Sequence, residues 1–318
     1  MQDSVCELFE TKTGLTMAER QGKLGDSWNE SAKRLLKLLG WQFVGDSDMD
    51  LPGTDSKEYG VDSVLKYSVA GKRTMQTALL ESKRYAMDSI KAGTLQQWLE
   101  RFHKKLSMLR NSKDLLKEFT ELDDCSPTNL GIVMVWVHDA DEIYLNQTFQ
   151  RYLENTVINT GGRVDAYSRI MVLDNRRITK LCAMVEVLKK YDDYNFVYPS
   201  GIIDNDTIEE SKVLSVEYMM SDIIIAECRK GRKSSSVVFY FGKMTEPSVA
   251  ALMEFLKVYQ RIDSKKPLDI YYYDSGADTI NVVNSFKNKE SYKKIINFQK
   301  LTHLAFNDEP SMIANDEQ

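Results

Sequence analysis

The sequence predicts an α/β protein: a mixed sheet flanked by helices in the N-terminal part, then a second α/β unit. Three patterns indicate this. Apolar residues recur at helical spacing from Thr94 to Arg110. The run 130–138 is apolar at successive positions, which is typical of a strand buried on both faces. After it, strand-like and helix-like segments alternate along the rest of the chain.

The first expected element is a helix that begins at Ser27. Ser27 is followed three residues later by Glu30, the pattern of a capping box. Leucines at 35, 36, 38 and 39 give the helix an apolar side, Gly40 ends it, and residues 41–44 form a short strand. Glu30 has two interpretations, because it either caps the helix or projects outward as part of an acidic site.

An acidic segment with Pro and Gly follows over residues 45–60, and we expect a solvated loop there. Asp46, Asp48 and Asp50 alternate as in some calcium loops. The Gly and the distal Glu of an EF-hand loop are not at the required offsets, however, which argues against calcium.

The most informative segment is a pair of strands over residues 59–69 and 77–86. A turn centred between Gly71 and Lys72 would place Asp62 opposite Glu81 on one sheet face. Lys83 is two residues beyond Glu81 and therefore points to the same face. Neighbouring carboxylates repel each other, and Mg²⁺ removes that repulsion because it prefers carboxylate and water oxygens. The pattern favours a site for metal-dependent phosphodiester hydrolysis; the alternative is that Lys83 pairs with an exposed carboxylate.

Charge is distributed unevenly along the chain. The net charge is −5, yet residues 66–113 contain eleven Lys or Arg against three acidic residues. Phosphate binding depends on local positive potential, so this stretch favours contact with DNA. The alternative is a solvated helix face.

Other classes of site are not supported. The four cysteines form no CxxC pair and indicate free thiols, and the three histidines are not at metal-ligand spacing. There is no Walker A loop. No apolar run or signal-peptide pattern points to a membrane, so we expect a cytoplasmic protein.

We expect two domains, over residues 1–200 and 201–318, because the segment 199–212 is polar and rich in turn residues. The C-terminal domain offers strands over 221–227, 234–242 and 268–274 and a helix over 246–262. It shows no catalytic constellation and is a candidate for DNA or partner binding.

The order of helix, strand, strand pair, helix and buried strand over residues 25–138 resembles the PD-(D/E)xK nuclease superfamily, the restriction-endonuclease-like fold. The resemblance implies a catalytic site formed by Glu30, Asp62, Glu81 and Lys83. Asp62, Glu81 and the carbonyl of Ser82 would bind Mg²⁺, with Mn²⁺ as a substitute. Lys83 would position or deprotonate the attacking water, and Glu30 would assist as an outer ligand.

The basic stretch around this site supplies the candidates for DNA contacts, which are Arg84, Arg101, Lys104 and Lys105. A nuclease half joined to an unassigned α/β half is similar to the nuclease subunit of GAPS-type two-gene systems of bacterial anti-phage defence. This implies a Mg²⁺-dependent DNA endonuclease that forms an oligomer and has a second protein subunit.

Two alternatives remain open. One is a catalytically silent nuclease fold that serves as a DNA-binding or assembly subunit; the intact Asp and Glu-x-Lys argue against it. The other is a structure-selective repair nuclease or resolvase, which would cut branched DNA as a symmetric homodimer.

Overall fold

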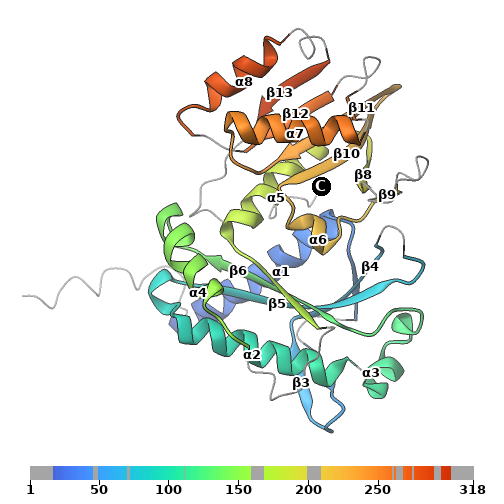
Figure 1. Cartoon of the computed structure of the whole chain (residues 1–318). Coiled ribbons are helices and arrows are strands. Elements are labelled where there is room, and N and C mark those ends of the chain that lie inside the picture. Colours follow the sequence, from blue (N-terminus) through green and yellow to red (C-terminus); the bar gives the residue numbers. More distant parts are fainter. Residues whose placement is uncertain are drawn as a thin grey trace, which may run out of the picture.

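Among the described residues, two large β-sheets of five and six strands, one in each part of the chain, form the framework of the protein, and a two-stranded hairpin is the third sheet (Figure 1). The computed structural model describes residues 17–45, 49–69, 72–110, 112–158, 168–198, 209–259, 261–262, 268–273, 276–289 and 295–301. Within these ranges no helix has the length and apolar character needed to cross a membrane. The α/β class predicted from the sequence is confirmed.

The N-terminal sheet is mixed, as predicted. Its strand order is β1-β4-β5-β6-β7, and β5 pairs antiparallel with β4 but parallel with β6. The strands are β1 (Gln42–Val44), β4 (Ser63–Tyr67), β5 (Gln76–Tyr85), β6 (Leu130–Val137) and β7 (Arg169–Leu173). All eight residues of β6 are buried, which confirms the interpretation of the apolar run.

The register of β4 and β5 is the one expected from the turn. Ser63 pairs with Leu80, and the ladder continues to Tyr67 and Gln76. The centre of the turn, residues 70 and 71, lies outside the described residues. The ladder stops at Ser63, so Asp62 comes directly before it, next to the position of Glu81 on β5.

Helices cover both faces of this sheet. Helix α1 (Met17–Leu38) packs Trp28 and Leu36 against the face that carries Leu80. Helix α2 (Ala92–Leu109) runs along the other face, which carries Leu79 (Figure 1). Side chains alternate along a strand, so Glu81 and Lys83 share the face of Leu79 and point toward α2.

Two local predictions were wrong. Helix α1 begins at Met17, so Ser27 lies inside the helix and is not its N-cap. Part of the segment expected to be a loop forms a hairpin of β2 (Met49–Pro52) and β3 (Glu58–Val61). Residues 46 and 48 lie outside the described residues. Leu51 and Val61 are buried, so burial of a few apolar side chains outweighs the acidic composition of the segment.

The second sheet has the order β13-β12-β11-β10-β8-β9. Its strands are β8 (Asp193–Tyr198), β9 (Glu209–Ser211), β10 (Ile223–Lys230), β11 (Lys233–Tyr240), β12 (Leu268–Tyr272) and β13 (Ile296–Lys300). Helices α7 (Glu246–Val258) and α8 (Thr279–Lys287) pack on one of its faces. The predicted strands over 221–227, 234–242 and 268–274 and the helix that begins near 246 match this unit.

Shorter elements connect these parts. They are η2 (Met87–Ser89), α3 (Lys113–Glu118), η3 (Thr120–Leu122), the π-helix η4 (Tyr144–Phe149), α4 (Gln150–Glu154) and α6 (Val216–Met219). Helix α5 (Asn175–Leu188) lies between the two sheets (Figure 1).

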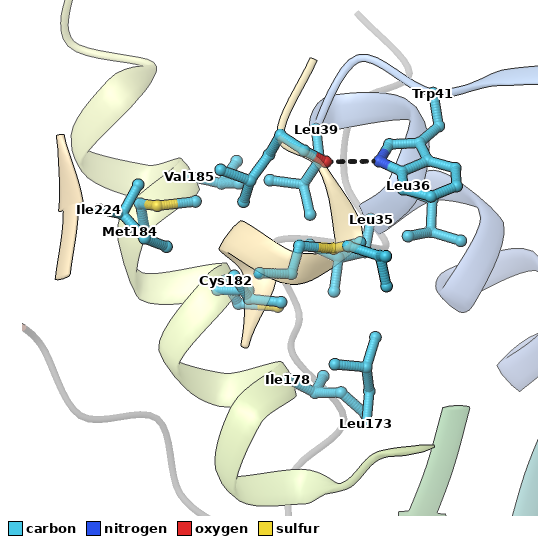
Figure 2. Close-up of a cluster of buried hydrophobic side chains, with 14 of the residues drawn as sticks. Leu35, Leu36, Leu39, Trp41, Leu173, Ile178, Cys182, Met184, Val185 and Ile224 are labelled. Carbon is cyan, nitrogen blue, oxygen red and sulfur yellow. Dashed lines mark hydrogen bonds between the residues drawn. The ribbon is translucent and has the colours of Figure 1, made fainter. Parts of the chain in front are cut away.

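One hydrophobic core joins the two sheets. Helix α5 packs with α1 on one side and with strands of the second sheet on the other, as the side chains in Figure 2 show. Trp41 Nε1 donates to the Leu214 carbonyl at 2.9 Å, and Leu214 N donates to the Leu39 carbonyl at 2.9 Å. The boundary near residue 200 stays a prediction; β8, which precedes it, pairs within the second sheet.

Candidate active site

Asp62 lies at the point where β4 and β5 stop pairing. It occupies a bend between β3 and β4, and its Oδ2 accepts a hydrogen bond from the backbone N–H of Ser82 at 2.5 Å. On the β4 side, where the ladder has ended, a carboxylate thus takes the place of a strand partner for Ser82, which pairs with Met134 of β6 on its other side. This contact fixes Asp62 beside β5, the strand that carries Glu81 and Lys83.

Glu81 is a buried carboxylate with two lysine partners. The residue is 5% exposed. Its Oε2 accepts from Lys83 Nζ at 2.7 Å, and its Oε1 accepts from Lys105 Nζ of helix α2. Burying a charge is costly unless it is paired and hydrogen-bonded, and here each oxygen has its own ammonium. The structure therefore brings Asp62, Glu81 and Lys83 together, with Lys105 as a fourth member.

The charge of Lys83 is stabilised by the same carboxylates. Burial lowers the pKa of Lys83, but the attraction and hydrogen bond of Glu81 and the charge of Asp62 outweigh it, so the pKa is raised overall. Lys83 is consequently a cation at neutral pH in this arrangement. It is suited to donating a hydrogen bond to an oxygen atom and not to accepting a proton.

Helix α1 contributes Asn29 to this region, whereas Glu30 faces away. Ser82 Oγ donates to Asn29 Oδ1 at 3.2 Å, and Asn29 is buried. The Glu30 side chain is 72% exposed and bonds to Lys33 Nζ at 2.5 Å. Within the described ranges, no set of three His, Cys, Asp or Glu residues is placed to hold a metal. The expected role of Glu30 as an outer ligand has no contact to support it in this structure.

The sequence contains a signal that could have indicated Asn29. Residues 29, 32 and 36 follow helical spacing, and Ala32 and Leu36 are buried. Asn29 lies on the inward stripe, while Glu30 is rotated by about 100° around the helix.

The four residues expected to contact DNA occupy different positions. Arg101 and Lys104 are exposed on α2. Lys105, on the same helix, is turned toward Glu81. Arg84 is partly buried on β5, and by strand alternation it shares the face of Ser82, opposite α2. Of these four, Arg101 and Lys104 combine exposure with a position on the helix that covers the carboxylates.

An aromatic pair flanks the lysines, and sequence analysis did not single it out. Tyr85 follows Lys83 by two residues on β5, and its ring lies 4.6 Å from that of Trp98 on α2, measured between centroids. Trp98 precedes Lys105 by two turns of the helix, so both face β5.

The oxygens at this site fit a divalent cation. Asp62 and Glu81 supply two carboxylates. In an extended strand the N–H and C=O of one residue point to the same side. Since the Ser82 N–H points to Asp62, its carbonyl does as well. Two carboxylates and a carbonyl would leave several coordination positions to water, unlike a structural metal site in which the protein supplies every ligand.

In a comparison with known protein families, the family described as GAPS4 protein PD-(D/E)XK nuclease domain matches residues 17–177, slightly more than half of the 318-residue chain. A comparison with curated proteins found no match. The matched segment runs from α1 through the whole N-terminal sheet and includes Asp62, Glu81 and Lys83. This confirms the resemblance indicated by the Asp and Glu-x-Lys pattern, and the chain belongs to the GAPS4 PD-(D/E)XK nuclease domain family.

Proposed function

We propose that this protein is a Mg²⁺-dependent DNA endonuclease of bacterial anti-phage defence. One observation carries the proposal: Asp62, Glu81 and Lys83 meet at the point where β4 and β5 part, within a fold of a nuclease family. Two adjacent carboxylates next to a lysine suit the hydrolysis of a phosphodiester bond.

Asp62, Glu81 and the Ser82 carbonyl would hold the metal. When bound, Mg²⁺ would polarise the phosphate and stabilise the negative charge that develops on it. Mn²⁺ prefers the same oxygen ligands and would serve as a substitute.

Lys83 would act as a fixed hydrogen-bond donor. Its raised pKa keeps its ammonium group charged, and Glu81 holds that group in place at 2.7 Å. A cation held at this position orients the attacking water or a phosphate oxygen. We therefore favour positioning of the water over its deprotonation as the role of Lys83.

DNA would approach along the exposed side of α2. Arg101 and Lys104 are three residues apart, so they lie on one side of the helix. Their exposure leaves both side chains able to reach phosphates. With a net charge of −5, the chain depends on such local potential to bind DNA. The acidic remainder is consistent with a second protein subunit, or a second copy, that completes the DNA groove.

Plasmid cleavage tests the proposal. Purified protein should nick or linearise plasmid with MgCl₂ and not with EDTA, and Glu81→Gln should abolish the activity. Glu118→Gln, an exposed carboxylate on α3, is the matched control and should cut like the wild type. If the chain alone is inactive, the same assay is repeated with the product of the neighbouring gene, the expected second subunit, added. Cleavage in EDTA, or by Glu81→Gln, would contradict the proposal.

A further inference from the structure

Lys105 stands apart from the other basic residues of α2. Its ammonium group donates to Glu81 Oε1, while Lys83 takes Oε2. The side chains of Lys105 and Lys83 are 26% and 25% exposed, and that of Glu81 is 7% exposed. The ion-pair cluster is therefore largely shielded from water, where ionic contacts are stronger than at the surface.

The packing of α2 determines where Lys105 points. Leu95, Leu99, Phe102, Leu106 and Leu109 are buried against the sheet. Lys105 lies next to Leu106 at the edge of this apolar stripe, on the side of Trp98. Burial of the stripe holds Lys105 over β5, and Arg101 and Lys104 remain exposed.

The charges of the four residues Asp62, Glu81, Lys83 and Lys105 cancel. Asp62 and Glu81 carry two negative charges, and Lys83 and Lys105 carry two positive charges. A divalent ion that binds Glu81 must take an oxygen that now accepts from an ammonium. With both lysines still on Glu81, the ion would also leave two excess positive charges in a shielded site.

Of the two lysines, Lys105 is the one whose ammonium group can move away from the Glu81 carboxylate. Lys83 is only two residues from Glu81 on the same strand and stays beside it. Lys105 reaches Glu81 from a separate helix through a long flexible side chain, and its neighbours Arg101 and Lys104 already face solvent.

We propose that Lys105 is an internal counter-ion that occupies Glu81 Oε1 until a divalent metal binds there. Metal binding then exchanges partners: the metal takes the Glu81 oxygen, and Lys105 turns toward the basic side of α2. Lys105 acts through Glu81 and is thus a positioning residue. The inference rests on the proposed metal site, and it adds that metal loading increases the positive charge available to a phosphate backbone.

A purely structural ion pair predicts a different response of metal binding to mutation. If Lys105 only maintained the fold, Lys105→Met would weaken metal binding or leave it unchanged. If Lys105 competes with the metal, Lys105→Met should tighten binding about tenfold, because a charge-assisted hydrogen bond no longer has to be broken.

Calorimetric titration of the full chain with MnCl₂ separates these cases. The variants are wild type, Lys105→Met, Lys104→Met and Glu81→Gln. Lys104→Met removes one charge from the neighbouring exposed position, so it controls for long-range electrostatics and should bind Mn²⁺ like the wild type. Lys105→Gln, which keeps an N–H donor but no charge, should be intermediate and replaces Lys105→Met should that variant fail to fold.

Thermal unfolding with and without Mn²⁺ gives a second measurement. Without added metal, Lys105→Met should melt below the wild type, since Glu81 loses one of its cations; saturating Mn²⁺ should remove most of the difference. Unchanged or weaker Mn²⁺ binding by Lys105→Met, with binding by the wild type that Glu81→Gln abolishes, would overturn this inference alone. Equal Mn²⁺ binding, or none, by the wild type and Glu81→Gln would overturn the metal site itself.

Discussion

Asp62 and Ser82 are joined where β4 and β5 stop pairing: the Asp62 carboxylate accepts the Ser82 N–H at 2.5 Å. The contact has two consequences. It terminates the antiparallel ladder with a side chain in place of a backbone carbonyl. It also holds a carboxylate beside Glu81, although Asp62 comes from a bend outside β5 and the two acids would repel each other if unrestrained.

Asparagine at position 62 would separate these two roles. Asp62→Asn keeps a carbonyl oxygen that can accept from Ser82, so we expect a melting temperature close to that of the wild type. The lost charge should lower plasmid cleavage by about 100-fold or more. Asp62→Ala removes the acceptor as well. The free energy of unfolding, measured with denaturant, should decrease by about 1–3 kcal/mol. Equal stability of Asn and Ala variants would show that the hydrogen bond contributes nothing to the fold.

Lys83→Ala should abolish cleavage while the protein stays folded. Glu81 is left with Lys105 as a partner, which limits the cost of the mutation. Cleavage should fall by about 100- to 1000-fold, as when a positioned donor is removed from an active site. DNA binding, measured by fluorescence anisotropy with CaCl₂ in place of MgCl₂, should change little. Wild-type cleavage by this variant would exclude Lys83 from the site.

The strand pair that carries the site was accessible from sequence because it depends on local information. A short turn between two strands fixes their register, and the observed pairing of Ser63 with Leu80 follows from it. The buried strand β6 was recognisable for a similar reason, since eight apolar or small residues in succession fit a strand covered on both sides.

The partners of the site depended on tertiary packing and were not accessible in the same way. Lys105 was expected to contact DNA because it belongs to the basic stretch over residues 66–113. The packing of α2 on β5 instead directs the Lys105 side chain toward Glu81. Glu30 and Asn29 are adjacent on α1. Which of the two side chains contacts β5 depends on which face of the helix is buried against the sheet.

Helix α8 shows where local helix propensity fails to predict the structure. Helix α8 has the sequence TINVVNSFK, which is rich in β-branched residues and asparagine and gives a weak helical signal. Val283 and Phe286 are buried against the second sheet, so packing stabilises a helix that sequence analysis did not predict.

The proposed role of the basic side of α2 in DNA binding can be tested by mutation. Arg101→Ala with Lys104→Ala should weaken binding of duplex DNA. The slope of log affinity against log salt should decrease by about 0.9 for each phosphate that the variant no longer neutralises. Lys117→Ala, at an exposed lysine of α3 that pairs with Asp114, is the matched control and should leave the slope unchanged. An unaltered slope in the double variant would place the DNA on another surface.

The hydrogen bond between Trp41 and Leu214 tests whether the two sheets unfold together. Trp41 is buried, stacks on Tyr67 at 4.0 Å between ring centroids, and donates to the Leu214 carbonyl across the shared core. Trp41→Phe keeps the stacking but removes the donor to that carbonyl. The free energy of unfolding should therefore decrease by about 1–3 kcal/mol. Because the core is continuous across α5, the loss should shift one cooperative transition, followed by far-ultraviolet circular dichroism and by tyrosine fluorescence. Two transitions, with only one shifted by the mutation, would show that the halves unfold independently despite the shared core.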